Sequence, residues 1–216
     1  MMNVIQITVT AMAENCYIAY NDVTMDGFVI DPGGDADKIL DAAERGRITP
    51  RAVLITHGHY DHIGGARAIS EAFNIPVICH TDDAEFLKKP ELNMSVYFGE
   101  KCSITPSRTV KDGDRLEYGG IKIFVIHTPG HTPGGCCYYV KEENTLFSGD
   151  TLFFESVGRT DFHMGDADKL IKSIRERIFT LPDETQIYAG HNEKTSVGWE
   201  KKNNPFIRPD KGGIYH

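Results

Sequence analysis

The feature that most constrains this chain is the segment from Thr56 to Gly65, which reads THGHYDHIGG. It gathers three histidines and one aspartate, a density of imidazole and carboxylate groups that folding alone does not require. Both groups are ligands for borderline and hard metal ions. In an extended backbone, period-2 alternation would direct His57, His59 and Asp61 to one side and leave His62 for a different ion. The segment therefore predicts a metal site.

Three later segments repeat one arrangement, in which an apolar strand is followed by a glycine-containing loop and a metal-ligand side chain. His131 follows the apolar run 121–126, Asp150 follows 145–147, and His191 follows 186–189. Rigid scaffolds hold functional groups in loops at strand ends, and glycine permits the tight turns needed there. We therefore predict that these three side chains join the histidine segment in one metal centre.

The apolar periodicity predicts more strands than helices. Strands are expected at 4–9, 16–20, 27–31, 52–55, 75–79, 115–118, 121–126, 136–140, 145–147 and 186–189, and helices at 35–45, 63–73, 82–88 and 167–179. Segment 89–108 is expected to be irregular, and about 204–216 to be a C-terminal surface extension. Because helices occur in both halves, two sheets covered by helices, in one domain spanning 1–216, is the natural packing.

Composition limits the functional classes. With 216 residues, 40% hydrophobic and a net charge of −8, the chain can form an ordinary core and lacks the basic excess typical of nucleic-acid binding. Since no apolar run approaches the roughly 20 residues of a membrane span and the N-terminus lacks signal-peptide features, we expect a cytoplasmic protein. The five cysteines include no CxxC pair, so buried free thiols are expected. The sequence leaves the oligomeric state open.

The pattern His57-x-His59-x-Asp61-His62, with later ligands in order, resembles the metallo-β-lactamase superfamily. The likeness extends from Asn15-Cys16-Tyr17 and Asp31-Pro32-Gly33 to His191. It implies an α/β fold of the four-layer αββα type, with two mixed sheets flanked by helices and the site at one sheet edge. It also implies that His57, His59 and His131 hold one metal ion, that Asp61, His62 and His191 hold a second, and that Asp150 bridges them.

Within the superfamily, the commonest β-lactamases carry a cysteine in place of Asp150 and lack the equivalent of His62, so antibiotic hydrolysis is not expected. Flavin-linked diiron oxidases carry a glutamate in place of His59, and RNA-processing members usually carry extra domains. We therefore expect neither of these two activities. Segments 128–134 and 158–162 are similar to the hydroxyacylglutathione hydrolase (glyoxalase II) group and to persulfide dioxygenases. Only 25 residues follow His191, so the separate helical substrate domain of larger glyoxalase II enzymes is not expected, and the use of glutathione stays open.

We expect hydrolysis of a small, anionic thioester, of the S-2-hydroxyacyl-thiol type. Two cations can lower the pKa of a bridging water toward roughly 7 and polarise the thioester carbonyl, while Asp61 orients the hydroxide. Arg159 is the candidate for binding a substrate carboxylate, and Tyr60 for lining the pocket. Asp31 and Asp161 are candidate partners of metal-bound imidazoles. Zinc is the expected metal, although iron and manganese accept the same ligands.

Alternative functions stay open at this point. One is a mononuclear iron persulfide dioxygenase that uses only His57, His131 and Asp150 or a similar subset. A lactone or other ester hydrolase of the same fold, or a metal-binding protein without catalytic activity, is a further possibility. His80 and His216 are expected to have no functional role, and His127 a structural one.

Overall fold

Two six-stranded mixed sheets pack face to face in the computed structural model, which describes residues 1–99 and 101–207. The first sheet has the order β1-β2-β3-β4-β5-β6, antiparallel from β1 to β3 and parallel from β3 to β6. The second has the order β14-β13-β10-β9-β8-β7, in which only the β10–β13 pair is parallel.

The elements have the following bounds. The first sheet comprises β1 Met2–Thr8, β2 Asn15–Asn21, β3 Asp26–Ile30, β4 Thr49–Leu54, β5 Val77–His80 and β6 Arg108–Val110. The second comprises β7 Arg115–Tyr118, β8 Ile121–His127, β9 Cys136–Val140, β10 Thr145–Gly149, β13 Gln186–Ala189 and β14 Thr195–Ser196, with the hairpin β11 Leu152–Phe153 and β12 Ser156–Val157 beside it. The helices are α1 Ala36–Gly46, α2 Tyr60–Ile63, α3 Ala66–Phe73, α4 Ala84–Lys88, α5 Ala167–Ser173 and α6 Val197–Asn203. A π-helical turn, Ile174–Ile178, continues α5, and 3₁₀ turns span Thr81–Asp83, Ser95–Tyr97 and Lys141–Glu143.

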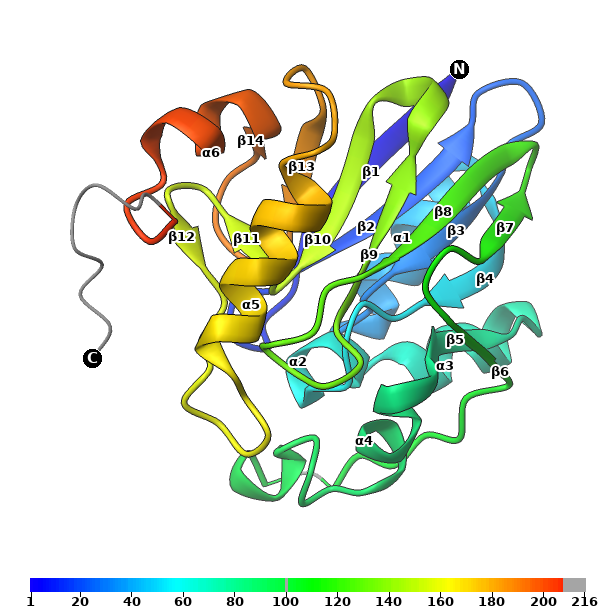
Figure 1. The fold of residues 1–216 in the computed structure, drawn as a ribbon. Coiled ribbons are helices and arrows are strands. Elements are labelled where there is room, and N and C mark those ends of the chain that lie inside the picture. The colour runs from blue at the N-terminus through cyan, green and yellow to red at the C-terminus, as the bar shows by residue number, and fades with distance from the viewer. Residues whose placement is uncertain (100, 208–216) are drawn as a thin grey trace.

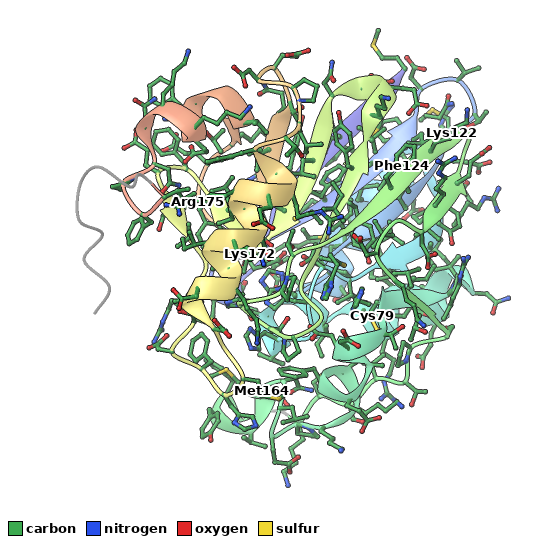
Figure 2. All side chains as sticks on the ribbon, viewed as in Figure 1. Cys79, Lys122, Phe124, Met164, Lys172 and Arg175 are labelled. Atoms are coloured by element: carbon green, nitrogen blue, oxygen red, sulfur yellow. The ribbon has the colours of Figure 1, made fainter. Side chains whose placement is uncertain are left out.

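Three apolar clusters separate four layers. Successive strand residues face opposite sides, so Leu54 packs between the sheets while Val53 packs against α1 and α3. The third cluster packs Leu170 and Ile174 against the outer face of the second sheet. Figure 1 shows α5 and α6 over that face and α1 and α3 over the other. Lys172 on α5 and Arg175 on the π-helical turn that continues it, both labelled in Figure 2, are exposed on the side away from the sheet. The predicted αββα architecture is confirmed.

The helix expected at 63–73 is two helices. α2 begins at Tyr60 and α3 at Ala66, because the chain turns at Gly64 and Gly65 against the loop after β3. The backbone N–H of Gly65 donates to the carbonyl of Pro32 at 2.7 Å, and a Cβ at Gly64 would lie 2.4 Å from the Gly33 carbonyl oxygen. Two glycines therefore permit this close approach.

The C-terminal part is more ordered than the sequence suggested. The apolar periodicity did not predict α6, whose N-cap residue Ser196 accepts a hydrogen bond from Trp199 N. The surface extension expected from 204 is wrong for two residues: Asn204 is buried and donates to Ser156 O at 3.0 Å, and Ile207 packs into the third cluster. Residues 208–216 lie outside the described part. Among the described residues, no helix has the length and apolarity to cross a membrane.

Candidate metal centre

The seven predicted ligand side chains meet where strands of both sheets end. β4 leads into the loop carrying His57 and His59, while β8, β10 and β13 lead to His131, Asp150 and His191. Each of two groups has its possible ligand atoms within 4.8 Å of one another: His57, His59 and His131, and Asp61, His62 and His191. These are the two groups that the sequence resemblance implied.

In the first group three ring nitrogens converge. His131 Nε2 lies 3.2 Å from His57 Nε2 and 2.9 Å from His59 Nδ1. Nitrogens bound to one tetrahedral zinc ion at 2.0–2.1 Å are about 3.4 Å apart, so the spacing suits a shared ion. Burial lowers the pKa of His57 and His131, and that of His59 to about 3. The rings are therefore neutral at pH 7, which is the form that binds metal.

Asp150 contacts both groups. Its Oδ2 lies 3.6 Å from His131 Nε2 and 3.6 Å from His191 Nε2, and its Oδ1 lies 3.3 Å from His62 Nε2. In the second group, Asp61 Oδ2 is 3.3 Å from His191 Nε2 and 3.8 Å from His62 Nε2. Burial acts to raise the pKa of the Asp150 carboxyl, but His62 and the other histidines outweigh it and hold that pKa low. A carboxylate in this position can bridge two cations.

Hydrogen bonds on the far side of the rings fix which nitrogen faces the centre. His131 Nδ1–H donates to the Arg159 carbonyl at 2.6 Å, and His62 Nδ1–H donates to Asp31 Oδ2 at 2.9 Å. Thr56 Oγ1 donates to the same Asp31 oxygen at 2.5 Å and lies 3.2 Å from His57 Nδ1, from which it can accept. Each Nε2 is thus left as an acceptor toward the centre, as in metal-bound histidines.

The alternation expected for the histidine segment is wrong at Asp61. The backbone becomes helical at Tyr60, so Asp61 lies one helical turn along α2 beside His62, and faces His191 rather than His57 and His59. Helical geometry, in place of a continuing extended chain, divides the segment between the two groups.

Buried polar atoms test whether a metal fits. His62 Nε2 and Asp150 Oδ1 are both buried, and beyond their 3.3 Å contact with each other they have no hydrogen-bond partner among the described residues. Leaving such atoms unpaired costs about 1–3 kcal/mol each, and more for a charged group. Both point to the same place and both are metal donors, so a divalent cation would satisfy them. The residues present therefore fit the metal that the motif implies.

A cavity of about 370 Å³ opens over the centre. Its base includes five of the predicted ligands, and its walls are largely apolar; the wall residues are Met12, Tyr60, Asn93, Met94, Phe98, Phe153, Arg159 and Phe162. The predicted pocket residues Tyr60 and Arg159 both line it, and Tyr60 stacks on Phe98 with ring centroids 5.6 Å apart. A second cavity, of about 640 Å³, adjoins it and shares Met12 and His191.

Arg159 and Asp161 form an exposed pair at the cavity. The guanidinium donates to both carboxylate oxygens, at 3.0 and 2.8 Å, and lies 4.4 Å over the Phe162 ring. We expected Asp161 to accept a hydrogen bond from a metal-bound imidazole. At His131, the carbonyl oxygen of Arg159 accepts the hydrogen bond from Nδ1 instead. Asp31, by contrast, lies against His62, with its Oδ2 2.9 Å from His62 Nδ1.

Sequence reasoning missed two buried carboxyls. Asp83 accepts from Gly58 N at 2.9 Å, Thr132 Oγ1 at 2.8 Å and Gly134 N at 2.6 Å, so one side chain joins two ligand-bearing loops. The Glu14 carboxyl lies 3.8 Å from His62 Nδ1, and burial raises its pKa well above the usual value. Neither residue belongs to a recognisable motif, because its partners are far away in sequence.

This fold and site define a metal-dependent enzyme of the hydrolase type. The chain belongs to the metallo-β-lactamase superfamily, whose profile matches residues 9–191. It is 35% identical over 209 residues to the hydroxyacylglutathione hydrolase GloC of Haemophilus influenzae, covering 95% of this chain and 98% of that protein.

Two solved structures are similar over nearly the whole chain. The crystal structure of the BLEG-1 B3 metallo-β-lactamase has a TM-score of 0.91 at 38% identity, covering 95% of this chain and 99% of that one. The di-iron-bound form of TTHA1623 has a TM-score of 0.83 at 33% identity, covering 94% and 99%. These likenesses confirm the predicted superfamily and fold, whereas the reaction stays a matter for proposal.

Proposed function

We propose that this protein hydrolyses a small anionic thioester with two divalent metal ions. The observation that carries the proposal is the position of Asp150, within 3.6 Å of nitrogens from both histidine groups. The proposed ligands are His57, His59 and His131 for one ion, Asp61, His62 and His191 for the other, and Asp150 between them. When bound, such ions lower the pKa of a water and polarise a carbonyl group.

The protein side chains would position the reactants. Asp61 faces the cavity and keeps a carboxylate there, because His62 and His191 outweigh burial and lower its pKa. It can therefore accept a hydrogen bond from the attacking water and orient it. A thiolate leaves without much help from an acid, which suits a site in which burial lowers the pKa of His57, His59 and His131 and keeps these rings neutral.

The cavity walls support a small substrate with one apolar part. Phe98, Phe153 and Phe162 offer apolar surface to the substrate, and Arg159 offers a cation at the cavity. The name of the Haemophilus relative supports a hydroxyacyl thioester. We propose zinc as the metal, with iron and manganese as alternatives. We also propose a reducing compartment such as the cytoplasm, which suits five cysteines that form no disulfide in the described part of the chain.

A substrate panel with metal analysis on the same sample tests this function. The panel contains S-2-hydroxyacyl thioesters of glutathione and of other small thiols, lactones, and a β-lactam, since a B3 metallo-β-lactamase is structurally similar. We expect two metal ions per chain and the highest kcat/KM on a thioester. A β-lactam or lactone turned over faster than every thioester would contradict the proposal, as would full activity in the Asp150→Ala variant.

An iron-dependent persulfide dioxygenase is the second candidate. The di-iron form of the similar TTHA1623 structure supports iron as a metal for this type of site. Oxygen consumption with a glutathione persulfide separates the two functions. One iron per chain together with oxygen uptake, and no thioester cleavage, would replace the hydrolase proposal.

A further inference from the structure

A second histidine pair lies outside both groups of the metal centre. His80 is the last residue of β5 in the first sheet, and His127 is the last residue of β8 in the second. Their rings stack nearly parallel, with centroids 4.0 Å apart and an interplanar angle of 9°. With Asp82 they form a cluster whose possible ligand atoms all lie within 4.8 Å of one another.

The hydrogen bonds leave one ring nitrogen of His127 available as a ligand and engage the candidate nitrogen of His80 only in a long contact. His127 Nε2–H donates to the Pro133 carbonyl at 2.9 Å, so its Nδ1 keeps a lone pair. This is the imidazole–carbonyl arrangement that also orients His131, and it is common in metal-bound histidines. His80 Nδ1 accepts a long hydrogen bond of 3.3 Å from Asp82 N. A metal ion at this nitrogen would take the place of that hydrogen bond, because the nitrogen has a single lone pair.

A carboxylate ligand, Asp82, and two further nearby carboxylates accompany the two histidines. Asp82 Oδ2 lies 3.8 Å from His80 Nδ1, and its side chain is 55% exposed, so an ion can reach it from solvent. Asp112 and Asp114 add negative potential at His80, although Arg177 pairs with Asp112 at 2.7 Å. Two imidazoles and a carboxylate are ligands typical of Zn²⁺, Cu²⁺ and Ni²⁺.

We propose that His80, Asp82 and His127 form an additional transition-metal site, separate from the catalytic centre. Water molecules complete its coordination. A shared ion requires the rings to open out of the parallel stack, so that both lone pairs point at it. The Cβ–Cγ torsion of histidine has a broad minimum, and His127 is only half-buried, so this movement is small.

The position of the cluster gives such an ion a structural effect. It would link the end of β5 to the end of β8, and therefore the two sheets, beside Cys79, which Figure 2 labels. Asp83 directly follows Asp82 and binds Gly134 N, next to the Pro133 carbonyl that holds His127. An ion here would thus stabilise the loop that carries His131.

Metal stoichiometry of the full chain tests the proposal. The protein is first loaded at its catalytic centre, then equilibrated with Cu²⁺ or Zn²⁺, and the bound metal is counted by native mass spectrometry. We expect the unchanged protein to bind one more ion per chain than the His80→Ala/His127→Ala double variant. The matched control is His163→Ala, which removes an exposed histidine and should bind as many ions as the unchanged protein.

A single substitution keeps the proposal testable if the double variant does not fold. Asp82→Asn keeps both rings and removes one exposed ligand, so we expect its affinity for the additional Cu²⁺ to fall about tenfold or more. The electron paramagnetic resonance spectrum of the additional Cu²⁺ should show nitrogen coupling. Equal stoichiometry in the unchanged protein and the double variant, or a spectrum without nitrogen coupling, would show that the pair is only a packing contact between the sheets.

Discussion

Asp83 provides the sharpest test of how the scaffold supports the metal centre. Its buried carboxylate accepts three hydrogen bonds, from Gly58 in the loop of His57 and His59 and from Thr132 and Gly134 in the loop of His131. The perturbation is Asp83→Asn, which keeps the shape and removes the charge. Because an amide has one acceptor and one donor end, at least one of the three donors then meets another donor.

The magnitudes can be worked out from the structure. Burial raises the pKa of Asp83 from 3.8 to about 6, so its charge costs about 3 kcal/mol at pH 7, and asparagine avoids that cost. If the amide oxygen keeps Gly58 N and Thr132 Oγ1, the Gly134 N–H loses its acceptor, at about 1–3 kcal/mol for a buried group. The two effects nearly cancel, so we expect the free energy of unfolding to change by less than about 2 kcal/mol. Metal affinity should nevertheless fall by about 10–100-fold, because the loop that carries His131 loses the hydrogen bond from Gly134 N to residue 83.

Two assays separate these effects. Denaturant unfolding of the metal-free protein gives stability, and competition with a chromophoric chelator gives metal affinity. Asp83→Ala, which leaves all three donors without an acceptor, should destabilise the protein by several kcal/mol. Asp41→Asn, on an exposed helix position, is the control and should change neither quantity. Unchanged metal affinity in Asp83→Asn would refute the reasoning.

Three further predictions follow from the geometry. Asp161→Asn should lower KM for an anionic substrate roughly twofold to fivefold by releasing Arg159 from its exposed pair, whereas Arg159→Met should raise KM, both measured by steady-state kinetics. Gly190→Ala should abolish binding of the second metal ion by metal analysis, since its Cβ would lie 2.4 Å from Asp150 Oδ1. The folded-state pKa of His59, about 3, is below the unfolded value of about 6.5, so protons favour the unfolded chain between these values. Acidifying the metal-free protein from pH 7 to 5 should therefore remove about 2 kcal/mol of stability through this group, a loss absent in His59→Gln.

The strand ends were the most predictable part of the molecule. The runs before His57, His131, Asp150 and His191 are apolar and short, so a sequence reader can place both the strand and the loop that follows it. Elements with little apolar signal were missed: β6, β11, β12 and β14 have two or three residues each, and they form because neighbouring strands supply their partners. The α6 helix depends likewise on contacts with distant residues such as Asp183, near Gly198.

The sequence by itself determined the chemistry of this protein: which side chains can bind metal, in what order, and that each follows a strand. Only the tertiary structure decided how these side chains divide into two groups. The two sheets bring His131 to His57 and His191 to Asp61 at the edge of the sandwich. It alone also showed Asp83 between two loops and the stacked pair of His80 and His127. The physical reason is that a motif records neighbours along the chain, whereas a coordination sphere and its supporting hydrogen bonds are set by packing between distant segments.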